Sequence, residues 1–163
     1  MMVASNIHFD IADRTRAIAA GGLGAIHLLA LKVGLVEDID NNIHLLKRHR
    51  PYHESDHVLA IAYDILAGGT RLGHLDIRRR GEVFLDALGA QRLPDPTTSG
   101  GFCGRFTQPD VDRLVNTINA VRLRVWKGQP DDFFDEAFLD ADDTLAPAGG
   151  WCKEGINVNH EGV

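Results

Sequence analysis

Apolar residues recur every three or four positions along most of residues 1–130, the spacing expected of helices that bury one side. The clearest pattern follows Ser55, a favourable N-cap residue, and closes at Gly68. Its apolar members are Val58, Leu59, Ala62, Ile65 and Leu66. A longer pattern begins at Pro109 and predicts an amphipathic helix to about Trp126. Its apolar members are Val111, Leu114, Val115, Ile118, Val121, Leu123 and Val125.

Shorter helices are expected around these two patterns. Gly34 ends the first of them, and the basic segment that leads to Pro51 ends the second. The expected ranges are Ala25–Val33, Ile39–Lys47, Gly81–Leu88 and a short helix that is capped by Thr97 or Thr98 and runs through Phe106. The sequence therefore predicts a mainly α domain of about six helices over residues 1–130.

The segment from Gly128 to Phe133, GQPDDF, is the clearest boundary along the chain. Residues 1–130 carry 16 Lys and Arg against 14 Asp and Glu, whereas residues 131–163 carry 1 against 9. Beyond the boundary, the apolar run Phe138–Ala141 predicts a buried strand. Residues 131–163 are therefore expected to open a second domain of different architecture.

Composition narrows the class of protein. The formal net charge is −6, and no apolar run approaches the ~20 residues that cross a bilayer. The N-terminus carries no basic segment followed by an apolar one, so we expect a cytoplasmic protein with no membrane partner. Cys103 and Cys152 lack metal-type spacing and are expected to stay reduced.

Three aspartates follow the predicted strand, at Asp140, Asp142 and Asp143, and Thr144 comes next. Carboxylates this close repel unless a cation or a proton lies between them, so the cluster indicates a hard-metal site for phosphate chemistry. Read as DxDxT, it resembles the first motif of haloacid-dehalogenase-type phosphatases, with Asp140 as nucleophile and Asp142 as acid and base. An acidic turn after an edge strand is the alternative without chemistry.

The segment His53-Glu54-Ser55-Asp56-His57 matches the H-E-x-x-H pattern of zinc peptidases. Its position at a predicted helix start and the absence of an evident third ligand favour a simpler interpretation. In that interpretation Glu54 and Asp56 stabilise the positive end of the helix dipole, and the two histidines are surface groups.

Arginines cluster in the middle of the chain, at Arg71, Arg78, Arg79, Arg80, Arg92 and Arg105. Together with a helix that Thr97 or Thr98 opens, they fit the layout of a helix-turn-helix, in which helix N-terminal amides and hydroxyls contact phosphates. Gly100, Gly101 and Gly104 weaken the second helix by about 1 kcal/mol each relative to Ala. The alternative is a solvated basic face.

Taken together, four blocks of the chain resemble the DDE transposases of bacterial insertion sequences (DDE domain group 1). In these enzymes a helical N-terminal domain precedes an RNase H-like catalytic domain. The blocks are PYHESDHVLAIAYDILAGGTRLGHLDIRR (51–79), LDALGAQRLPDPTTSGGFCGRF (85–106), NAVRLRVW (119–126) and FFDEAFLDADDTLAP (133–147).

The resemblance implies that Asp142 is a catalytic aspartate on the first strand of the RNase H-like fold and holds Mg²⁺ with other acids, Asp140 lying beside it. It also implies that double-stranded transposon-end DNA is the partner, with Arg78, Arg79, Arg80, Thr97, Thr98 and Arg105 as the expected DNA-binding residues. Asp143 departs from the family, because a small residue is usual there.

The later Asp and Glu of the catalytic set are not found before Val163, so we expect a truncated transposase that is inactive alone. Two alternatives remain open. One is a small DxDxT phosphatase, whose turnover would be lost in Asp140→Asn. The other is a non-catalytic DNA-binding or regulatory remnant. The sequence also leaves open whether the chain forms a homodimer.

Overall fold

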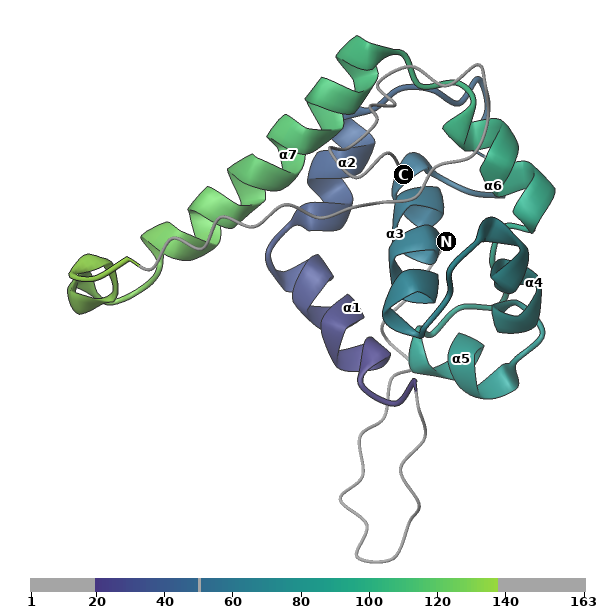
Figure 1. Ribbon diagram of the computed structural model, residues 1–163, viewed down its shortest axis with the longest axis horizontal. Coiled ribbons are helices and arrows are strands. Elements are labelled where there is room, and N and C mark those ends of the chain that lie inside the picture. Colours follow the sequence, from purple (N-terminus) through teal and green to yellow (C-terminus); the bar gives the residue numbers. More distant parts are fainter. Residues whose placement is uncertain (1–19, 50, 138–163) are drawn as a thin grey trace, which may run out of the picture. The chain divides into compact units, whose positions relative to one another are not determined.

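The computed structural model describes residues 20–49 and 51–137, and within them the regular elements are helices joined by loops, without a strand. The chain divides into two compact units after Gln129. The first unit holds α1 (Leu23–Lys32), α2 (Leu35–Asn42), α3 (Glu54–Leu66), the 3₁₀ turn η2 (Leu72–His74), α4 (Leu75–Arg78), α5 (Glu82–Ala87), α6 (Pro96–Cys103) and α7 (Gln108–Lys127) (Figure 1). The mainly α prediction is confirmed for these residues.

Helix α3 forms the centre of the first unit and packs against α2, α4 and α6 (Figure 1). Its residues Leu59, Ala60 and Tyr63 are at most 5% exposed. Around them lie apolar side chains from the neighbouring segments, namely Leu23, Leu75, Phe84, Leu88, Ala90 and Leu93. Each large side chain buried in this way contributes about 1.5–3 kcal/mol. Of the apolar residues whose spacing predicted α3, Leu59 belongs to this core, whereas Ile65 and Leu66 are 61% and 59% exposed.

The second helix differs from the prediction Ile39–Lys47. Gly34 adopts the left-handed conformation, with φ +78°, and α2 starts at the next residue. Acidic side chains in the first turn of α2 favour this early start. The helix ends at Asn42 because Ile43, which is fully buried, takes an extended backbone. Residues 43–49 are therefore a loop.

Two predicted caps were also wrong. The N-cap of α3 is His53, and Ser55 instead donates from its backbone N and its Oγ to the carboxylate of Asp40, at 2.8 and 2.9 Å. The N-cap of α6 is Asp95, whose Oδ1 accepts from the backbone N of Thr98 at 2.9 Å. In both cases a carboxylate satisfies helix N-terminal amides more strongly than the predicted hydroxyl.

Helix α7 matches its prediction, and it packs mainly against α2. Only Thr117 and Val121 of its residues are buried. Arg124 ties the helix to the α1–α2 turn by donating to the carbonyl O of Val33 at 2.8 Å and to Oδ2 of Asp38 at 2.6 Å. Most of the helix surface thus remains exposed.

Of the second unit the structure describes residues 130–137, which include a short 3₁₀ turn, η3 (Asp131–Phe134), with two exposed aromatic side chains. The predicted strand Phe138–Ala141 lies outside the described residues. Within the described part of the chain, no helix is both long and apolar enough to cross a membrane.

Candidate nucleic-acid interface

The loop between α2 and α3, residues 43–49, is held in place by a buried carboxylate. Glu54, in the first turn of α3, is fully buried, and its Oε1 accepts from the backbone N of Leu45 and of Leu46 at 3.0 Å each. Its Oε2 lies 3.1 Å from Nδ1 of His49. Because a charged acceptor strengthens such hydrogen bonds, Glu54 fixes the course of the loop from the inside.

Arg105, which follows α6, holds the same loop from the other side. Its Nη1 donates to the carbonyl O of Leu45 at 3.0 Å. Together the loop and Arg105 line an open groove of about 650 Å³, which we call the cationic groove. Its residues are His44, Leu45, Leu46, Lys47, Arg48 and Arg105.

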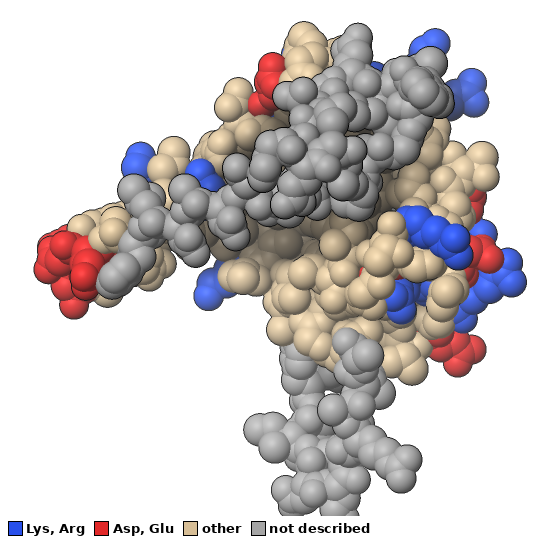
Figure 2. Space-filling view, viewed as in Figure 1, with Lys and Arg blue, Asp and Glu red and all other residues tan. Residues whose placement is uncertain are grey.

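Charge in the cationic groove is of one sign. Three of its six lining side chains, Lys47, Arg48 and Arg105, are permanent cations, and none is a carboxylate. All three are exposed, whereas the carboxylate of Glu54 is buried behind the loop and turned toward backbone amides. In Figure 2, Lys and Arg side chains stand out on the rim of the molecule where the loop runs in Figure 1. Such a groove suits a polyanion.

The predicted DNA-binding arginines are not equivalent. Nε of Arg78 donates to Oδ1 of Asp64 at 2.9 Å, and its Nη2 donates to the carbonyl O of Ala67 at 2.7 Å. The Asp64 side chain is 4% exposed and that of Arg78 23%. The guanidinium also lies 5.7 Å from the ring centroid of Phe84. Arg78 is therefore part of the internal structure that joins α4 to α3.

The next two arginines of the run share one acid. Arg79 Nη1 lies 3.6 Å from Oδ1 of Asp76, and Arg80 Nη2 lies 2.8 Å from its Oδ2. Both side chains remain exposed, Arg80 to 75%. Figure 2 shows basic side chains near α4 with acidic ones interspersed. This surface carries mixed charge, in contrast to the cationic groove.

The two predicted threonines lie at the start of α6. Both are exposed, and Thr98 donates from its Oγ1 to Oδ2 of Asp95 at 2.7 Å. These hydrogen bonds, first of all the one from the Thr98 side chain, lower the pKa of Asp95. The N-terminus of α6 thus already has an anion. In addition, α6 packs mainly against η2 and α3.

The H-E-x-x-H residues do not converge on a metal. Glu54 faces the loop, and His57, which is 2% exposed, stacks on Phe102 with ring centroids 4.5 Å apart. The expectation that both histidines are surface groups is therefore wrong for His57. Burial lowers the pKa of His57, the carboxylates of Asp56 and Glu54 oppose this, and the charge of Arg105 adds to the lowering. In the described part of the chain no group of three or more His, Cys, Asp or Glu is placed to hold a metal ion.

The acidic cluster Asp140, Asp142 and Asp143, with its predicted Mg²⁺ site, lies outside the described residues. Of the predicted DNA-binding residues, only Arg105 lies in the cationic groove. Sequence reasoning missed Lys47 and Arg48 because the periodicity assigned Lys47 to the end of a helix. The basic run that begins at Lys47 was the available signal.

Comparisons of the chain with models of known protein families, with curated proteins and with solved structures found no match.

Proposed function

We propose that the first unit is a DNA-binding domain and that the cationic groove contacts the phosphate backbone of a duplex. The observation that carries the proposal is the groove itself, a hollow of about 650 Å³ with three permanent cations and no carboxylate among its lining residues. Glu54 and Arg105 hold the backbone of the loop that carries two of these cations, so this backbone is positioned before DNA binds.

The wider proposal is that this domain belongs to a DDE transposase. Its support is the resemblance of four sequence blocks, two of which, residues 51–79 and 85–106, contain Arg105 and the helix that carries Glu54. The RNase H-like strand, Mg²⁺ and the catalytic role of Asp142 remain predictions from that resemblance. We also propose that the chain alone neither cleaves nor joins DNA, and a metal-dependent strand-transfer assay on a transposon-end duplex would test this.

A salt-dependence experiment tests the groove. The full chain is titrated with a fluorescent duplex of random sequence at several salt concentrations. Each phosphate contact that a cation makes contributes about 0.9 to the slope of log K against log salt, with K the association constant, because bound counterions are released. For Lys47→Ala/Arg48→Ala we expect the slope to fall by about 1.8.

The matched control removes the same charge elsewhere, as Lys32→Ala/Lys127→Ala, from α1 and α7. We expect the control to weaken binding only through net charge and to leave the slope within about 0.5 of the unchanged chain. Absence of duplex binding at low salt would overturn the proposal. The same is true if the groove variant and the control behave alike.

A further inference from the structure

Helix α7 exposes a row of apolar side chains on the side that α2 leaves uncovered. Val111, Val115, Ile118 and Val125, which we call the α7 stripe, are 40%, 50%, 43% and 39% exposed. Their spacing of four, three and seven positions puts them on one face of a helix, along about 21 Å. Trp126, at 39% exposed, adjoins the stripe, with the guanidinium of Arg122 5.0 Å from its ring centroid.

The apolar surface continues from α7 onto α1. A groove of about 560 Å³ is lined by Val125 at the end of the stripe and by Leu29 and Val33. Leu29 is 57% exposed. An apolar surface that spans two helices is more than the scattered exposed residues normal for a monomer, and it indicates a contact surface.

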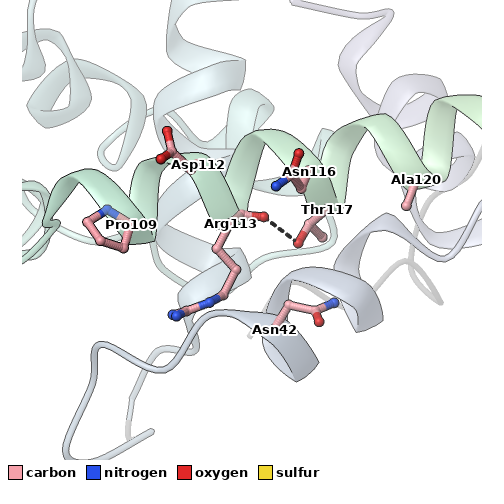
Figure 3. A pocket seen from close by; sticks show the side chains of 7 residues that line it. All are labelled: Asn42, Pro109, Asp112, Arg113, Asn116, Thr117 and Ala120. Atoms are coloured by element: carbon pink, nitrogen blue, oxygen red, sulfur yellow. Dashed lines mark hydrogen bonds between the residues drawn. The ribbon is translucent and has the colours of Figure 1, made fainter.

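Charges along α7 are polarised. Its first turns carry Asp110 and Asp112, and the one cation there, Arg113, pairs with Asp110 at 3.0 Å. Its last turns carry Arg122, Arg124 and Lys127 and no acid. Asp112 points away from Asn42 of α2 (Figure 3), so its carboxylate is available to a partner; its polar neighbour is Gln108, whose Nε2 donates to Oδ1 at 2.9 Å. Along the helix, Asp112 precedes Ile118 and Arg122 follows it, and Ile118 is near the middle of the stripe.

We propose that the α7 stripe is the contact surface of a homodimer in which α7 packs antiparallel to α7 of a second copy. In this orientation Asp112 of each copy lies near Arg122 of the other, whereas a parallel pair would bring like charges together. The arrangement is self-complementary under a two-fold axis, and it opposes the two helix dipoles. The contact does not depend on DNA binding.

The first test measures association of the full chain without DNA, by sedimentation equilibrium over a range of concentrations. We expect a monomer–dimer equilibrium that Ile118→Asp weakens at least tenfold, since a charge would be buried in the contact. Ile118 is 43% exposed, so the change empties no core. The matched control is Ile65→Asp, at a position 61% exposed on α3, which should leave the dimerisation constant unchanged.

A charge swap tests the orientation. Asp112→Arg and Arg122→Asp should each weaken the dimer, and the double variant should restore it, because the pair reforms between copies. In a parallel dimer the double variant would restore nothing. A chain that stays monomeric at all concentrations overturns the proposal, as does a monomer in which residues 130–163 protect the stripe from hydrogen exchange. Circular dichroism of each variant separates loss of the contact from loss of the fold.

Discussion

Two arginine-bearing regions of the first unit differ in how their charges are paired. The run Arg78–Arg80 has the denser positive charge along the sequence, yet Arg78 is paired with a buried carboxylate and its two neighbours share Asp76. The cationic groove has fewer consecutive cations, but none of its lining residues is an acid. The difference shows that the position of the nearest carboxylates, more than the density of cations in sequence, decides which charges are available to a ligand.

The largest expected effect comes from breaking the internal pair of the first region. Arg78→Met should lower the free energy of unfolding by about 3 kcal/mol, because it leaves the nearly buried carboxylate of Asp64 without its cation. Urea unfolding of the variant measures this. The control Arg80→Met removes a side chain that is 75% exposed and should change stability by at most about 0.5 kcal/mol. Equal losses for the two variants would contradict the distinction between them.

The second prediction concerns the support of the groove. Glu54→Gln keeps an acceptor for the amides of Leu45 and Leu46 but removes the charge, so we expect a loss of about 1.5 kcal/mol. Hydrogen exchange at these two amides should accelerate more than in the core of α3. The control Glu82→Gln, at an exposed position in the first turn of α5, should leave both measurements nearly unchanged. Unchanged exchange in Glu54→Gln would show that the loop is held by other contacts.

The spacing of apolar residues in the sequence was sufficient to predict a helix where the helix depends mainly on its own residues. The apolar spacing of α3 and α7 predicted both helices. It did not predict which side of each helix is buried, because Leu59 and Val121 are buried whereas Ile65 and Ile118 are exposed. The first helix and α5 were likewise found within a few residues of their bounds, next to glycines that end them or precede them. The sequence shows the apolar residues of the α7 stripe, but it does not show that α2 leaves them uncovered.

Contacts between distant segments could not be predicted in the same way. The groove depends on Glu54 reaching back to the amides of Leu45 and Leu46, and on Arg105 reaching the carbonyl of Leu45. Because the sequence does not reveal these contacts, the basic residues near Lys47 were interpreted as the end of a helix. Arg78 looked like a surface cation for the corresponding reason, since nothing in its own neighbourhood in sequence reveals that it meets Asp64.

The third prediction connects the groove to acid stability through His57. Burial lowers the pKa of this histidine below its ordinary 6.5, so the unfolded chain takes up the proton first as the pH falls. The neutral form of buried His57 therefore contributes fully to the free energy of unfolding above pH 6.5. Below pH 6.5 this contribution is lost, until the pKa of the folded state is reached, with a slope of no more than about 1.4 kcal/mol per pH unit. Urea unfolding at several pH values measures the slope.

Two variants separate this histidine from the other titrating groups. In His57→Gln the slope below pH 6.5 should be shallower than in the unchanged chain. Arg105→Ala should raise the pKa of His57, as followed by NMR of the imidazole, because the charge of Arg105 is one of the causes that lower it. A slope that is the same with and without His57 would assign the acid sensitivity to other residues.

The smallest expected effect tests the mixed-charge surface for DNA binding. Arg80 is the most exposed arginine of the run, but Asp76 lies 2.8 Å from its guanidinium and offsets its field. We therefore expect Arg80→Ala to reduce the salt slope of duplex binding by well under the ~0.9 expected for Lys47→Ala. Asp76→Asn should have the opposite sign and strengthen binding, because it frees both Arg79 and Arg80. If Arg80→Ala instead reduces the salt slope as much as Lys47→Ala does, the run Arg78–Arg80 also contacts phosphates. Neighbouring carboxylates would then not decide which cations are available to DNA.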